Sequence, residues 1–119
     1  MESKRPLQEK SYAFAVRIVR LYRYLVHEKG EYVLSRQILR SGTSIGANAA
    51  EGRYAVGARD LRAKLIISLK ECEETLYWLN LLKDTGYLTE AQFFSLDRDC
   101  QELRRLLTSS VKTLQKRTE

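Results

Sequence analysis

Few residues of this chain have the types and spacing that catalysis or metal binding requires. His27 is the only histidine, and the two cysteines, Cys72 and Cys100, form no CxxC pair and have no zinc-ligand spacing. Residues 71–74 include three glutamates, but a di-iron bundle also needs a Glu-x-x-His motif on two helices, which this sequence lacks. It also lacks a phosphate-binding loop and a nucleophile elbow. The sequence therefore predicts no enzyme, no catalytic residue, no metal site and no cofactor.

A second set of side chains is basic and lies on one side of the helix predicted for residues 9–28, opposite its apolar stripe. It consists of Lys10, Arg17, Arg20, Arg23 and His27, with Tyr24 among them. Arginines contact phosphates and a tyrosine can stack on a base, so these five basic residues are candidate nucleic-acid contacts. The alternative is the ordinary charged outer face of a surface helix.

Two polar ridges lie on the next two predicted helices, residues 33–53 and 59–84, at steps of three and four residues. The first ridge consists of Gln37, Arg40, Ser44, Asn48 and Glu51. The second ridge consists of Asp60, Lys64, Ser68, Glu71 and Thr75, with Glu74 one step around the helix. If the ridges face each other, opposite charges can pair between helices or subunits, for example Arg40 with Glu71. The alternative is that both ridges are ordinary solvated faces.

Small residues interrupt the segment that carries the first ridge. Gly42 and Gly46 lie inside the predicted helix, where each glycine costs about 1 kcal/mol relative to alanine. Small side chains let a neighbouring helix or a ligand approach closely. We favour helix packing as the reason for these glycines, with a ligand as the alternative.

Four amphipathic helices are expected to position these residues, at about 9–28, 33–53, 59–84 and 89–115. Apolar residues recur at steps of three and four, which is the pattern of amphipathic helices. These stripes consist of Phe14, Ile18, Leu21 and Leu25 in the first helix; Leu61, Leu65, Leu69, Cys72, Leu76 and Leu79 in the third; and Phe93, Leu96, Cys100, Leu103, Leu107, Val111 and Leu114 in the fourth. Because both cysteines lie within the stripes, core packing is favoured over a redox role.

The punctuation between the helices agrees with this division. Gly30 and Gly86 follow the first and third helices, and Thr89 with Gln92 forms a capping box for the fourth. Short connections make successive helices antiparallel neighbours. We therefore predict an all-α fold, an antiparallel up-and-down four-helix bundle that forms one domain over residues 1–119.

The third helix has more apolar surface than one core requires. Its additional residues are Ile66, Ile67, Tyr77, Trp78 and Leu81. An exposed patch of this kind indicates a partner, and the simplest partner is another copy of the chain. The alternative is that the other three helices cover this face.

Charge and composition limit the partners and the location. The net charge is +6, most of it within the first 30 residues, which favours anionic partners such as RNA or DNA. The first ten residues are polar and resemble no signal peptide, and no apolar run reaches membrane-spanning length. We therefore expect a cytoplasmic protein that does not enter the membrane.

The segment from Arg40 to Asn48, followed by Glu51-Gly52, resembles the signature of the four helix bundle protein family. That family includes the intervening-sequence proteins encoded inside bacterial large-subunit ribosomal RNA genes. The resemblance extends to residues 14–19, 70–79 and 86–88 and covers roughly residues 11–107. It implies an up-and-down bundle that assembles as a homopentamer. It also implies that most residues of the two ridges are family-motif positions.

Two hypotheses for the function follow from these observations. The leading one is a non-enzymatic, oligomeric module that binds nucleic acid, RNA in particular, through the basic faces of a ring. The alternative is a protein-interaction scaffold with an incidental basic surface. A steep dependence of binding on salt would favour the first hypothesis over the second.

Overall fold

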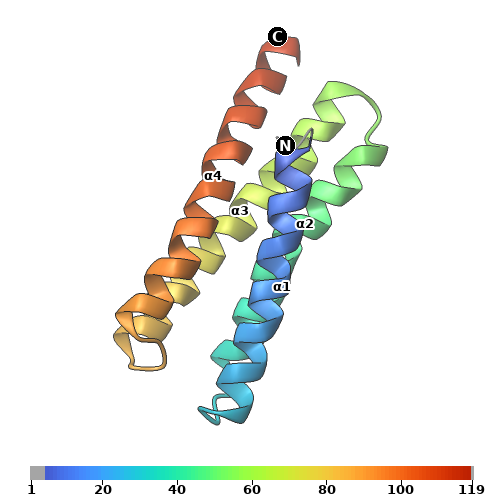
Figure 1. Ribbon diagram of the computed structural model, residues 1–119. Coiled ribbons are helices and arrows are strands. Elements are labelled where there is room, and N and C mark those ends of the chain that lie inside the picture. Colours follow the sequence, from blue (N-terminus) through green and yellow to red (C-terminus); the bar gives the residue numbers. More distant parts are fainter. Residues whose placement is uncertain (1–4, 119) are drawn as a thin grey trace.

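The computed structural model describes residues 5–118, which fold into four long helices joined by short connections (Figure 1). The helices are α1 (Pro6–His27), α2 (Leu34–Glu51), α3 (Gly57–Asp84) and α4 (Glu90–Thr118), and a 3-10 turn, η1 (Gly52–Tyr54), lies between α2 and α3. Successive helices run antiparallel, so the N-terminus of α1 and the C-terminus of α4 lie at the same end (Figure 1). The predicted all-α, antiparallel four-helix bundle is confirmed.

The helix ends follow local sequence signals. α1 begins at Pro6, earlier than we predicted, because the fixed backbone angle of proline suits the first turn of a helix. Gly30 and Gly86 have φ values of +62° and +85°, which end the preceding helices as predicted. The capping box of α4 is also confirmed. The N–H of Thr89 donates to Gln92 Oε1 (2.9 Å), and the N–H of Gln92 donates to Thr89 Oγ1 (3.1 Å).

The start of α2 depends on a residue that the sequence analysis did not single out. Glu31 is buried, and its carboxylate accepts hydrogen bonds from the backbone N–H groups of Val33 (3.0 Å), Leu34 (2.9 Å) and Ser35 (2.7 Å). Burial by itself would raise the pKa of this carboxyl group. The bonds from Ser35, Leu34 and Val33 outweigh that effect, and the pKa of Glu31 is lowered. Glu31 therefore caps the otherwise unpaired first turn of α2.

The core consists of the apolar stripes that the periodicity predicted. All four residues predicted for the first helix are buried, and in the other stripes only Leu61, Leu69 and Val111 are half-buried. Cys72 and Cys100 are fully buried free thiols whose sulfur atoms lie 3.5 Å apart between α3 and α4. Hydrogen bonding between the two thiols and burial raise the pKa of Cys100. Both observations agree with a packing role.

The two glycines of α2 allow α1 to approach closely. A Cβ atom on Gly42 would lie 2.7 Å from Cγ1 of Ile18, and one on Gly46 would lie 3.2 Å from the backbone oxygen of Ser11. At Gly42 the neighbouring side chain would have to move, and at Gly46 the contact with the backbone of Ser11 would be tight. Contact between α1 and α2 therefore accounts for both glycines, as the packing interpretation predicted.

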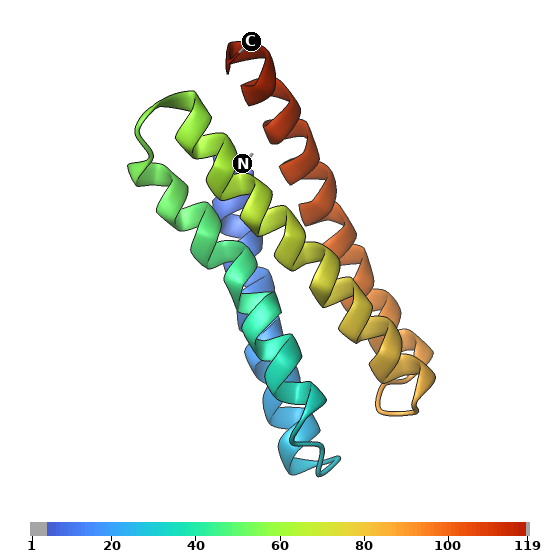
Figure 2. The same cartoon turned by 180° about the vertical axis from the view of Figure 1, so that it is seen from behind.

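The helices pack in chain order, and the seam between α1 and α4 is the least closed. α1 lies against α2, α2 against α3, and α3 against α4, whereas α1 and α4 touch over a shorter stretch. The C-terminal end of α4 reaches beyond the start of α1 (Figures 1 and 2). A cavity of about 730 Å³ opens between these ends, with Leu7 and Leu114 in its lining. None of the four helices between residues 5 and 118 combines the length and apolar character of a membrane span.

Candidate functional site

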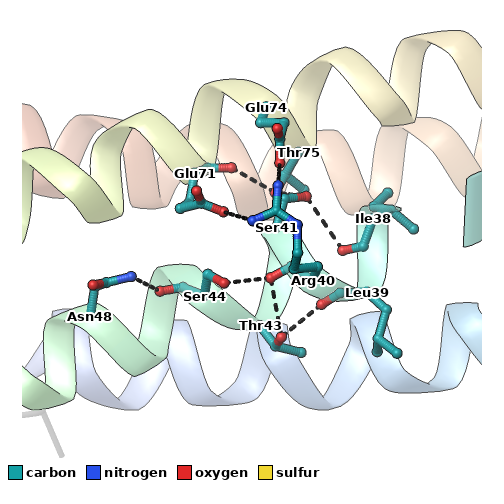
Figure 3. Close-up of polar contacts among 10 residues, drawn as sticks. All are labelled: Ile38, Leu39, Arg40, Ser41, Thr43, Ser44, Asn48, Glu71, Glu74 and Thr75. Carbon is teal, nitrogen blue, oxygen red and sulfur yellow. Dashed lines mark hydrogen bonds and ion pairs between the residues drawn. The ribbon is translucent and has the colours of Figure 1, made fainter. Parts of the chain in front are cut away.

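The two polar ridges face each other across α2 and α3 (Figure 3). Arg40 Nη2 donates to Glu74 Oε2 at 2.8 Å, and Arg40 Nη1 lies 3.9 Å from Glu71 Oε2. Nearer the η1 end of the same pair of helices, Lys64 Nζ donates to Glu51 Oε2 at 3.3 Å. These three contacts link opposite charges between the helices, including the pair between Arg40 and Glu71 that the spacing suggested.

Beneath these ion pairs, hydroxyl groups join the same two helices inside the core. Ser68 Oγ donates to the backbone oxygen of Ile45 at 2.6 Å. Thr75 Oγ1 lies 3.0 Å from Ser41 Oγ and 2.8 Å from the backbone oxygen of Glu71 (Figure 3). Ser41, Ser68 and Thr75 are fully buried, so this part of the ridges is not a solvated face.

Four other ridge residues do not bridge the helices. Ser44 Oγ donates to the backbone oxygen of Arg40 (2.6 Å), and Asn48 Nδ2 donates to that of Ser44 (2.8 Å), so both bonds stay within α2 (Figure 3). Gln37 is exposed. Asp60 Oδ2 accepts the N–H of Val56 at 2.9 Å and so caps the start of α3.

Among the charged residues of the ridges, Glu71 has the least favourable environment for a negative charge. Its side chain is 19% exposed, and its Oε2 atom is buried without a hydrogen-bond donor. Burial raises the pKa of Glu71, the neighbouring carboxylate of Glu74 raises it further, and the guanidinium of Arg40 offsets only part of this. No set of three or more His, Cys, Asp or Glu side chains within residues 5–118 is arranged to hold a metal ion. The contacts of the ridges can therefore fix the register of α2 against α3.

On α1, two of the five predicted basic contacts are bound to α4. Arg17 donates to the backbone oxygen of Ser95 (3.1 Å), to Ser95 Oγ (2.8 Å) and to Asp99 Oδ2 (2.7 Å). Lys10 forms an ion pair with Glu102. Lys10 and Arg17 thus hold α1 against α4, and their positive charges are balanced by carboxylates. The periodicity of α1 gave no indication of these partners on α4.

The other three basic residues of α1 point to solvent. Arg20, Arg23 and His27 are exposed, and none has an ion-pair or hydrogen-bond partner within the described part of the chain. Tyr24 is half-buried beside them, with the ammonium of Lys29 5.9 Å from the centroid of its ring. This surface, formed by Arg20, Arg23 and His27, is called the basic face of α1 below.

Three basic residues on one side of α4 form a second group of cations without carboxylate partners among residues 5–118. Arg98, Arg105 and Lys112 are exposed and, like the basic face, have no carboxylate partner between residues 5 and 118. Their seven-residue spacing keeps them on one side of α4, one step from Ser95 and Glu102, which contact α1. That seven-residue spacing is visible in the sequence and could have indicated this group.

The predicted interface residues of α3 differ in exposure. Ile67 and Tyr77 are exposed, at 44% and 62%, whereas Ile66 and Leu81 are half-buried. Trp78 packs against the core and meets Tyr77 edge to face, with ring centroids 5.1 Å apart. Its indole N–H is buried with no acceptor in the part of the chain described. The exposed apolar surface is thus narrower than the sequence indicated, because α2 and α4 cover part of it.

Fold and ridges together define a class of small, all-helical bundle whose second and third helices are joined by a polar network. The chain belongs to the 23S rRNA-intervening sequence protein family, whose model matches residues 5–109. The family resemblance seen in the sequence is thereby confirmed.

A solved structure supports the same assignment. It is the crystal structure of a protein of unknown function from the S23 ribosomal protein family of Bacteroides thetaiotaomicron. The two sequences are 52% identical over 89% of this chain and 98% of that chain, with a TM-score of 0.88. No curated protein matches this chain. Neither the family description nor the structural neighbour names a catalytic activity.

Proposed function

We propose that this protein is a non-enzymatic, oligomeric, cytoplasmic module that binds RNA through the basic face of α1. The observation that carries the proposal is that Arg20, Arg23 and His27 share one exposed helix face with no carboxylate partner among residues 5–118. Unpaired guanidinium groups on a rigid surface suit the phosphates of a nucleic acid.

The two paired cations contribute to this surface in a different way. Because Arg17 is held by Ser95 and Asp99, and Lys10 by Glu102, α1 cannot easily rotate against α4. The basic face is therefore presented in a fixed orientation relative to α4, which carries the exposed cations Arg98, Arg105 and Lys112. A bound strand that contacts both helices would release several counterions, which makes its affinity depend steeply on salt.

The proposal includes the assembly of several copies of the chain, because the family resemblance implies a homopentamer. The exposed side chains of Ile67 and Tyr77 on α3 favour contact with a second copy through this helix. A ring would repeat the basic face and raise the affinity for RNA through avidity.

An anisotropy titration tests RNA binding. The protein is titrated against labelled structured RNA and single-stranded DNA, at low and at physiological salt. We expect saturable binding that weakens with salt and is lost in the double variant Arg20→Glu/Arg23→Glu. The matched control is Arg36→Glu/Arg59→Glu, which makes the same charge change at exposed residues of α2 and α3. Absence of binding at low salt, or equal loss in both variants, would refute the proposed role of the basic face.

A mass measurement in solution tests the assembly separately. We expect a multimer that Ile67→Glu/Tyr77→Glu reduces to a smaller species. The control is Tyr54→Glu in η1, which also places a charge at an exposed aromatic residue. A monomeric wild type would contradict the assembly. A stable multimer that binds no RNA would instead favour the protein-interaction scaffold.

A further inference from the structure

We infer that a hollow between α1 and α4 binds one unstacked nucleobase, so that the RNA recognised by this protein is single-stranded. The inference rests on the proposed function and gives it a ligand class. The hollow has a volume of about 290 Å³ and lies beside Arg20, at the edge of the basic face. This volume is at the lower limit of typical ligand pockets, which suits one planar group and not a longer stretch of the strand.

The lining of the hollow has the chemistry of a base-binding site. Its floor is apolar, with the buried side chains of Leu21, Leu88 and Leu96. Tyr24, whose ring is half-buried, contributes an aromatic surface at its wall. An apolar floor beside an aromatic ring favours the flat face of a base over a hydrated ion, and stacking on such a ring tolerates any base.

Arg17 gives the hollow a second planar group. Three hydrogen bonds, two from Nη1 and one from Nη2, hold its guanidinium against Ser95 and Asp99. The orientation of this guanidinium is therefore fixed before any ligand arrives. Arginine guanidinium planes, like aromatic rings, stack on unpaired bases in single-stranded RNA.

Gln92 offers hydrogen-bond donors at the same place. Its Oε1 accepts the backbone N–H of Thr89 at 2.9 Å, so the oxygen is already engaged in capping α4. The capping bond leaves the Nε2 group of Gln92, with its two donors, for the edge of a base. Arg20, which also lines the hollow and is exposed, suits the phosphate attached to that base.

The site excludes a regular duplex for a geometric reason. In a duplex the bases are stacked and paired, and their faces cannot enter a hollow in the protein surface. A strand whose bases are free can place one base between Tyr24 and Arg17 while its backbone follows the basic face. Single-stranded RNA is therefore expected to bind more tightly than duplex RNA of equal length.

Three probes test this inference with the full-length protein: a single-stranded oligouridine, an abasic oligomer of the same length and phosphate count, and a paired RNA duplex. We expect the oligouridine to bind at least about fivefold more tightly than the abasic oligomer, the lower limit for one base stacked on an aromatic ring. Tyr24→Leu should remove this preference and Tyr24→Phe should keep it. Tyr12→Leu, at an exposed tyrosine of α1 outside the hollow, is the control.

The outcomes separate the two proposals. Equal binding of oligouridine and abasic oligomer that Arg20→Glu/Arg23→Glu abolishes would overturn the base site and leave the proposed function intact. Tighter binding of duplex, or a preference for bases that survives Tyr24→Leu, would also overturn the base site. No salt-dependent binding of any probe would overturn both.

A photo-crosslink gives a readout that does not depend on a variant folding correctly. A 5-iodouridine oligomer bound to the wild-type protein is irradiated, and the attachment point is mapped by mass spectrometry. We expect attachment at Tyr24. Attachment only at other aromatic residues would overturn the base site.

Discussion

The hydroxyl oxygens of Ser41 on α2 and Thr75 on α3 lie 3.0 Å apart, and both side chains are fully buried. These two buried hydroxyl groups stabilise the bundle only while they are hydrogen-bonded, because a buried hydroxyl without a partner is costly. The contact therefore favours one register of α2 against α3. The ion pairs from Arg40 and Lys64 lie nearer the solvent and add less.

The first prediction concerns this buried pair. Thr75→Val keeps the shape of the side chain and removes its hydroxyl, so Ser41 loses its partner on α3. We expect the free energy of unfolding to fall by about 1–2 kcal/mol in a denaturant titration. The same change at Thr113, an exposed residue of α4, should alter it by less than about 0.5 kcal/mol. Equal effects at the two positions would contradict the role given to the pair.

Gly42 provides a test of the contact between α1 and α2. Alanine is favoured in a helix by about 1 kcal/mol, but here its Cβ would overlap the side chain of Ile18. We expect Gly42→Ala to destabilise the protein by about 1–3 kcal/mol in spite of the better helix propensity. In a double-mutant cycle with Ile18→Ala, the double variant should lose less free energy of unfolding than the sum of the losses in the two single variants. A stabilising Gly42→Ala would show that α1 does not pack this closely.

Glu31 should make the protein sensitive to acid. Because its pKa is lowered on folding, its contribution is fully present above its ordinary value of 4.5 and is lost as the pH falls through the folded value. We expect Glu31→Gln to reduce the free energy of unfolding at neutral pH by roughly 1–2 kcal/mol, as for loss of an N-cap. The difference from wild type should shrink as the pH falls below 4.5. A difference that stays constant with pH would show that the charge of Glu31 is not involved.

Glu71 should have the opposite dependence on pH. Its pKa is raised on folding, so below its ordinary value of 4.5 the side chain is neutral in both states, and stability is lost as the pH rises through the folded value. Glu71→Gln removes this penalty. We expect it to raise the free energy of unfolding at neutral pH by less than about 1 kcal/mol, with the gain vanishing at low pH. The control is Glu73→Gln, which makes the same change at an exposed neighbouring glutamate. A loss of stability in Glu71→Gln would mean that the ion pair of Glu71 with Arg40 outweighs the cost of burying its charge.

Periodicity predicted the fold because the core stripes are a local property of each helix. Phe14, Ile18, Leu21 and Leu25 are buried as their spacing required, and the glycines and the Thr89 box ended or began helices as their chemistry required. The cap formed by Glu31 was missed because it lies three residues before α2 begins, and the usual capping signal is Ser, Thr, Asp or Asn.

The candidate sites depend on contacts between different helices, which the residue pattern of a single helix does not predict. The partners of Arg17 are more than 75 residues away in the chain, so its spacing gave no sign that α4 neutralises it. Ser68 and Thr75 are polar by type, and only the approach of α2 shows that they are buried. The hollow beside Tyr24 likewise needs Gln92 and Leu96 from α4.

The most direct test of the proposed function is the salt dependence of RNA binding in matched variants. The logarithm of the association constant is measured against the logarithm of the salt concentration for wild type, Arg20→Ala/Arg23→Ala and the control Arg36→Ala/Arg59→Ala. If Arg20 and Arg23 each contact a phosphate of a single strand, the slope of the first variant should be shallower by about 1.4 than that of wild type, and the control should match wild type. Identical slopes in all three proteins would contradict the assignment of RNA binding to the basic face of α1.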